Sequence, residues 1–213
     1  MKTISLTHGR ITLALHPLKE GDGRPLLHLH GLGLRSPDVL PDDLSSWPGP
    51  VYALDFTGHG ASTIPTGGGY TPEVLMGDVD AAIQHLGEVT LIGRGLGAYI
   101  ALLAAGGRPD AVRGAILCDG PGIAGGGPSP GTPQVARVDP DAPSPPDPWA
   151  LAELSKDVRP PDYAVDFAQL ASTNAHNPFA IVAKARPDWL TAVAEEVGAT
   201  PTTLEEALRS YSR

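Results

Sequence analysis

A chain of 213 residues is typical of a single globular domain and is long enough to bury a sizeable hydrophobic core. Apolar residues make up 41% of it but form no run of the roughly 18 that a membrane helix requires, so we expect no membrane segment. The formal net charge of −9, without a basic stripe, argues against a nucleic-acid partner. A single cysteine, Cys118, and an N-terminus without a secretory signal pattern together predict a cytoplasmic protein.

Segments with the pattern of strands alternate with segments that have helical spacing. Strand patterns occur at residues 3–7, 11–16, 26–30, 51–55, 89–92, 114–118 and 179–184. Helical spacing occurs at residues 72–86, 96–105, 149–156, 162–172, 188–197 and 202–210. The first two strands predict a hairpin at a sheet edge. The order of the others predicts an α/β fold, a mostly parallel twisted sheet with helices on both faces, in one domain over residues 1–213.

Residues 123–148 differ from the rest because glycine and proline dominate them. This composition cannot bury enough apolar area to hold a packed element. We therefore expect a mobile loop there, in the position of a lid.

Three glycine-rich turns follow three of the predicted parallel strands. They are HGLG at residues 30–33, DFTGHGAS at residues 55–62 and GRGLG at residues 93–97. In an open α/β sheet, ligands bind in the crevice outside the carboxyl ends of the strands, so we expect all three turns to line it. Their set and order resemble the α/β-hydrolase superfamily, which has an HG turn, a D-x-x-G-x-G-x-S loop and a G-x-S-x-G nucleophile elbow.

The resemblance covers about residues 10–122 and implies a site at the elbow. It implies that Gly95 stands where the family has its nucleophilic serine, and that the N–H groups of Leu32 and Leu96 converge above it in an oxyanion-hole geometry. His30 and Gly31, in the same turn as Leu32, are implied to belong to this site. A serine introduced at position 95 is expected to fit, because the family places one there.

The same turns permit other interpretations. The elbow glycines could bind a dinucleotide, but their spacing is G-x-G-x-G rather than G-x-G-x-x-G, so we expect no cofactor. His28, His30 and His59 could come together, but no Asp or Cys completes a ligand set, so we expect no metal. The segment GRGLGAYI also resembles the elbow of the N-myc downstream-regulated proteins, hydrolase relatives with glycine at this position that are regarded as non-enzymatic.

The resemblance also implies an acid and a histidine downstream of the elbow, the histidine after the last strand. The acid could be Asp188 or Asp119. His176 is the one histidine that follows Gly95 in the sequence, but it precedes the last predicted strand. Here the chain departs from the family, and its C-terminal part is shortened.

These observations favour an α/β-hydrolase-fold protein that lacks the serine nucleophile and binds a small apolar carbonyl or carboxylate ligand, or a protein partner. The alternative is a weak hydrolase of an activated ester or lactone, in which His176 or His30, oriented by Asp119, activates a water while the two amides hold the oxyanion. A third possibility is a scaffold that forms a homodimer through its helical C-terminus.

Overall fold

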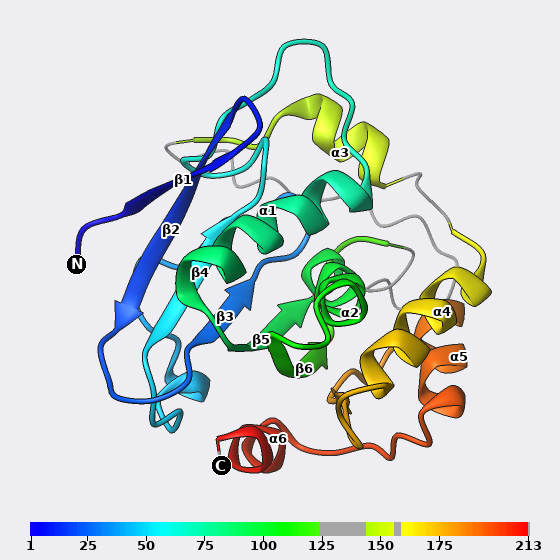
Figure 1. Cartoon of the computed structure of the whole chain (residues 1–213). Coiled ribbons are helices and arrows are strands. Elements are labelled where there is room, and N and C mark those ends of the chain that lie inside the picture. Colours follow the sequence, from blue (N-terminus) through cyan, green and yellow to red (C-terminus); the bar gives the residue numbers. More distant parts are fainter. Residues whose placement is uncertain (124–143, 156–158, 213) are drawn as a thin grey trace.

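The computed structural model describes residues 1–123, 144–155 and 159–212. Most of the loop predicted at residues 123–148 therefore lies outside the described residues. Within the described ranges seven strands form one sheet (Figure 1): β1 (Ile4–His8), β2 (Ile11–Lys19), β3 (Leu26–Leu29), β4 (Val51–Asp55), β5 (Val89–Arg94), β6 (Val112–Cys118) and β7 (Phe179–Ile181).

The spatial order of the strands is β1-β2-β4-β3-β5-β6-β7. The hairpin of β1 and β2 forms one edge and pairs antiparallel with β4 through β2, whereas β3 to β7 run parallel to one another. This confirms the predicted mostly parallel sheet with an edge hairpin. Because β3, β5 and β6 are parallel and adjacent, their carboxyl ends open onto the same side of the molecule.

The last strand is shorter than predicted. It ends at Ile181 rather than Lys184, because the N–H groups of Val182 and Ala183 both donate to the carbonyl of Leu117, which breaks the regular ladder. Beyond it, Pro201 forms a parallel bridge with Ile181 on the outer side of β7.

In the described residues, six α-helices and a short 3-10 helix surround the sheet (Figure 1). They are α1 (Pro72–Leu86), α2 (Leu96–Gly107), α3 (Pro148–Leu154), α4 (Pro161–Ser172), α5 (Asp188–Glu196), α6 (Leu204–Tyr211) and η1 (Asp42–Leu44). The start of α1 follows from its sequence, since the Thr71 hydroxyl accepts a hydrogen bond from the Val74 N–H and Pro72 occupies the first turn. Gly87, with φ +81°, ends it.

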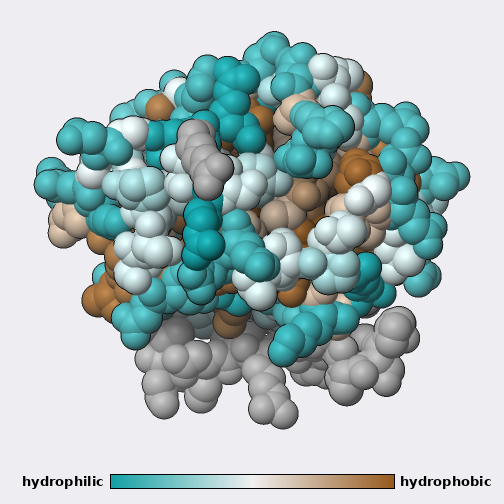
Figure 2. Space-filling view, turned by 90° about the horizontal axis from the view of Figure 1, so that it is seen from below, coloured by the Kyte–Doolittle hydropathy of each residue, from teal (hydrophilic) through white to brown (hydrophobic). Residues whose placement is uncertain are grey.

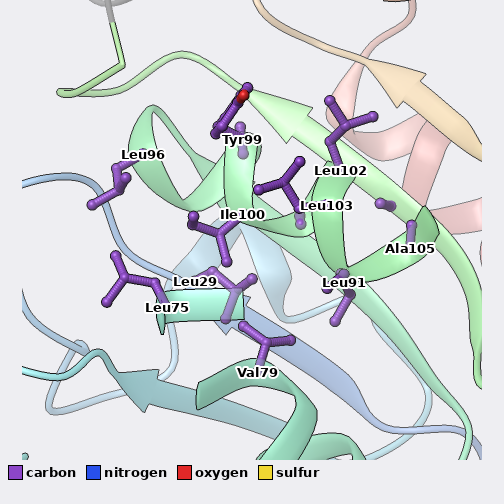
Figure 3. Close-up of a cluster of buried hydrophobic side chains, with 14 of the residues drawn as sticks. Leu29, Leu75, Val79, Leu91, Leu96, Tyr99, Ile100, Leu102, Leu103 and Ala105 are labelled. Carbon is purple, nitrogen blue, oxygen red and sulfur yellow. The ribbon is translucent and has the colours of Figure 1, made fainter. Parts of the chain in front are cut away.

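The helices cover both faces of the sheet. Side chains of α1, α2, α4 and α5 form the larger core with one face, whereas η1 and α6 pack on the other. The nearly all-apolar α2 lies at the centre of the larger core, and Figure 3 shows its Ile100 and Leu103 in one cluster of buried side chains with Leu29 and Leu91 of the sheet. Burial of each such side chain contributes about 1.5–3 kcal/mol, so the helix that follows β5 is firmly held.

The surface is mixed in character. Figure 2, seen from below relative to Figure 1, shows hydrophobic residues in separate areas among hydrophilic ones. None of the helices in the described parts of the chain combines the length and the apolar character needed to cross a bilayer.

Candidate functional site

The turns that follow β3, β5 and β6 pack tightly against one another. A Cβ atom added to Gly31 would lie 2.6 Å from Cδ of Pro121, and one added to Gly122 would lie 2.7 Å from Cβ of Leu32. At Gly95 an added Cβ would overlap the carbonyl oxygen of Pro121. Glycine is therefore required at three positions by the close approach of these turns.

The turn from β5 into α2 has the sharp geometry of a strand-to-helix elbow. Gly95 has φ +56° and ψ −114°, a conformation that residues with a side chain rarely adopt, and its carbonyl accepts from the N–H of Ala98 in the first turn of α2. Added Cβ atoms at Gly93 and Gly97 would overlap the backbone of Gly97 and Leu29 respectively. The three elbow glycines thus let α2 start directly against the sheet.

The expectation that a serine would fit at position 95 is wrong for this conformation. Its Cβ would meet Pro121 and Gly120 through their backbone atoms, which cannot rotate away as a flexible side chain would. The turn after β6 therefore occupies the space in which a side chain at the elbow would stand.

The N–H groups of Leu32 and Leu96 point at one oxygen atom. Both donate to the carbonyl oxygen of Pro121, each at an N···O distance of 2.9 Å. Donors at 2.7–3.1 Å from a common oxygen are the arrangement that stabilises a developing oxyanion in acyl-transfer enzymes. Here the oxygen belongs to the chain itself.

Little space remains beside the elbow. The cavity there has a volume of about 10 Å³, close to the minimum that holds one water molecule. Its lining residues come from α2 and its preceding turn, from the end of β6 and from the segment between β7 and α5: Gly95, Ala98, Cys118, Asp119, Gly120, Gly122, Ala183, Ala185, Pro187, Trp189 and Leu190.

Both ring nitrogens of His30 are engaged. Nε2 accepts a hydrogen bond from the N–H of Phe56 at 3.2 Å, so the proton lies on Nδ1, which donates to the carbonyl of Gly31 at 2.8 Å. Burial lowers the pKa of His30 to about 4, which keeps the ring neutral. In this state His30 has no free lone pair with which to activate a water.

His59 is held in the same way. Its Nδ1 donates to the carbonyl of Thr57 at 3.1 Å and its Nε2 accepts from the N–H of Gly33 at 3.4 Å, while burial lowers its pKa to about 3. His28 is also buried, and its pKa is lowered to about 4 by burial and by the charge of Arg94. The rings of His30 and His59 connect the turn after β3 with the turn after β4, whereas His28 lies within β3.

Asp119 and His176 lie at opposite ends of the sheet. The Asp119 carboxylate accepts hydrogen bonds from the N–H groups of Lys184 and Ala185, at 2.8 and 2.9 Å, so it fastens the turn after β6 to the segment after β7. His176 precedes β7, at the amino end of the parallel strands, whereas Gly95 follows the carboxyl end of β5. The structure therefore does not bring His176 to the elbow.

The DFTGHGAS loop is fixed by a buried carboxylate that ends β4. Asp55 accepts hydrogen bonds from His16 Nε2 at 3.0 Å and from the N–H groups of Ala61 and Ser36 at 2.8 and 2.7 Å. Burial opposes its charge, but these bonds outweigh burial and hold its pKa well below the ordinary value. The hydroxyl of Ser62 donates to the Asp55 carbonyl, so it too is tied to the loop.

Two important residues were missed from the sequence. Asp78 of α1 is fully buried and accepts from the N–H and the hydroxyl of Thr57, both at 2.8 Å, as well as from His8. Burial raises the pKa of Asp78. Pro121 supplies the oxygen described above, and nothing in its residue type signals that role, because any backbone carbonyl could accept these bonds.

Comparison with known proteins agrees with this architecture. The profile of the family described as "Alpha/beta hydrolase family" matches residues 26–211. The chain belongs to the alpha/beta hydrolase family. This confirms the resemblance drawn from the three glycine-rich turns.

Two of the similar proteins align with only part of this chain. It is 31% identical over 125 residues to the (E)-2-((N-methylformamido)methylene)succinate hydrolase of Acinetobacter baylyi, a match that covers 56% of the chain and 45% of the relative. The aligned region thus spans less than half of that hydrolase. Mouse alpha/beta hydrolase domain-containing protein 10 is 22% identical with a TM-score of 0.48, over 55% of this chain and 49% of that one.

One solved structure matches along the whole length. A hypothetical protein of Pseudomonas aeruginosa has a TM-score of 0.65 with 17% sequence identity, and the match covers 100% of this chain and 97% of that protein. At this identity the likeness shows the fold alone.

Proposed function

We propose that this alpha/beta hydrolase family member does not act as a serine-type hydrolase and instead binds the carbonyl or carboxylate oxygen of a small ligand at its elbow. The observation that carries the proposal is the convergence of the Leu32 and Leu96 N–H groups on one oxygen, at 2.9 Å each. The ligand oxygen would take the position of the Pro121 carbonyl. Such a pair of donors favours a polarised or charged oxygen.

The chemistry around Gly95 supports a site without serine-type hydrolase activity. Position 95 has no hydroxyl, and His30 has both ring nitrogens engaged. Cys118 is only 4% exposed, and burial raises the pKa of its thiol to about 11, so it stays protonated at neutral pH. A catalytic triad acts as a unit, so a site without its nucleophile and without a nearby base loses nearly all of the triad's rate advantage.

The relative from Acinetobacter baylyi supports the ligand class. Its name describes a hydrolase of a substituted succinate, and succinates carry carboxylate groups. We infer that a small carboxylate is the best first probe for this chain. The weak-hydrolase alternative has no comparable support, since His176 lies at the far end of the sheet.

Two measurements on the purified full chain test the proposal. With p-nitrophenyl acetate, butyrate and octanoate at neutral pH, we expect no turnover above the rate of the spontaneous reaction. Turnover that is lost in the variants His30→Gln and Asp119→Asn, but kept in Glu195→Gln, which changes an exposed carboxylate on α5, would overturn the proposal that the site does not act as a serine-type hydrolase. In an NMR titration with butyrate, we expect saturable shifts of the Leu32 and Leu96 amide signals. Unchanged signals at both residues would overturn ligand binding at the elbow.

A further inference from the structure

The turn formed by residues 119–123 fills the site that the proposed ligand would occupy. We propose that it makes an autoinhibitory contact. The Pro121 carbonyl accepts the hydrogen bonds of the Leu32 and Leu96 N–H groups in place of a ligand and can be displaced, and the Asp119 side chain is the latch that holds the turn in place. This inference rests on the proposed function, because displacement matters only if a ligand uses the same amides.

The turn and a ligand exclude each other. With the Pro121 carbonyl on the Leu32 and Leu96 amides, the cavity beside Gly95 has a volume of about 10 Å³. A carboxylate of even four carbons needs far more room than one water molecule. Binding at the amides therefore requires that the turn move away first.

The latch lies on the half-exposed side of the turn. The Asp119 carboxylate accepts from the Lys184 and Ala185 N–H groups, which belong to the segment between β7 and α5. In the described part of the chain, these are the two hydrogen bonds that the Asp119 carboxylate accepts, and both are exposed to solvent. Bonds in such a position open more readily than those of a buried strand.

The other end of the turn is strained. Ile123 has φ +45°, and among the described residues it is the one residue other than glycine with a positive φ. A β-branched residue is disfavoured there, so surrounding contacts must hold it. One of them is the hydrogen bond from Trp189 Nε1 to the Ile123 carbonyl at 3.3 Å. Movement of the turn would release this strain, which favours opening.

The chemistry of the amides favours a charged competitor. Pro121 offers a neutral carbonyl, whereas a carboxylate makes charge-assisted hydrogen bonds that are roughly twice as strong. The Leu96 N–H also begins α2, a helix of 12 residues whose N-terminus attracts negative charge. A small carboxylate therefore has the means to replace the internal carbonyl.

Hydrogen exchange of the full chain tests the contact without any ligand. Because the Leu32 and Leu96 amides share one acceptor, they should exchange through the same opening and give equal protection factors in the wild type. The variant Asp119→Asn keeps the size of the side chain but loses one acceptor, and we expect both amides to exchange about tenfold faster. Glu195→Gln, which changes an exposed carboxylate on α5, serves as the control and should leave both rates unchanged.

The outcomes separate the two proposals. Unequal protection of the two amides in the wild type, a result that needs no variant, would overturn the claim that both are protected by the Pro121 carbonyl. Equal protection that Asp119→Asn leaves unchanged would overturn the latch. If both amides open faster in Asp119→Asn and butyrate binds this variant about tenfold more tightly than the wild type, both proposals are supported. If they open faster but butyrate shifts neither amide signal, the movable turn is supported and the ligand proposal falls.

Discussion

Replacing Gly95 with alanine tests how closely the elbow and the turn after β6 depend on each other. The added Cβ would lie 2.5 Å from the Gly120 carbonyl oxygen and closer still to the Pro121 carbonyl oxygen. The backbone would have to move by about 1 Å to restore an ordinary separation of about 3.5 Å. In addition, the turn would hold the alanine backbone at φ +56° and ψ −114°, a conformation that residues with a side chain rarely adopt.

Both effects destabilise the native state. A residue held in a sparsely populated backbone region costs about 1–3 kcal/mol, and overpacking of a dense region costs a similar amount. We therefore expect Gly95→Ala to lower the free energy of unfolding by about 2–6 kcal/mol, a large part of the 5–15 kcal/mol that is typical of a folded domain.

Urea denaturation followed by circular dichroism measures this loss, and Gly198→Ala is the matched control. Gly198 also has a positive φ, +63°, but an added Cβ would have nothing within 4 Å. The free energy of unfolding of that variant should fall only by the cost of the unfavourable backbone conformation, about 1–2 kcal/mol. If Gly95→Ala proves no more destabilising than Gly198→Ala, the tight contact between the two turns is refuted.

Two further predictions concern the buried polar groups that hold the turns. His28, His30 and His59 have pKa values of about 4, about 4 and about 3 in the folded chain, below the ordinary 6.5. The fold is therefore most stable above pH 6.5 and loses stability as the pH drops toward 4, because the unfolded chain binds these protons first. The unfolding free energy should decrease by about 4 kcal/mol per pH unit in this range, and a flat profile would contradict the assignment. Asp78→Asn removes an acceptor from the Thr57 N–H or hydroxyl inside the protein. It should cost about 1–3 kcal/mol and lower the melting temperature by about 2–4 °C per kcal/mol in a thermal scan, and an unchanged temperature would show that Asp78 does not hold the loop.

Much of the architecture was predictable because local signals agree with the fold. Thr71 and Gly87 mark the two ends of α1, and the apolar run at 51–55 coincides with β4. Most remaining differences are shifts of a few residues at element ends, where tertiary contacts decide. The early end of β7 is an example, since it depends on how two amides share the carbonyl of Leu117, and that carbonyl belongs to another strand.

The site was predictable only in part. Turns after parallel neighbouring strands must meet at the carboxyl edge, which places Leu32 near Leu96 from sequence alone. The acceptor of their hydrogen bonds was not predictable, because the Pro121 oxygen belongs to the backbone and residue type does not reveal which carbonyl takes this position. The state of His30 was equally hidden, since a pattern of residues does not show which of its ring nitrogens carries the proton.

The bridge between Ile181 and Pro201 has a consequence for how copies of this chain could associate. Proline has no N–H to donate, and the Thr202 N–H already donates a hydrogen bond to the Ile181 carbonyl on the outer side of β7. A strand from a neighbouring molecule would find no regular row of partners there. Growth of the sheet from chain to chain is thus stopped at this border, and a dimer formed at this border would have to meet through side chains.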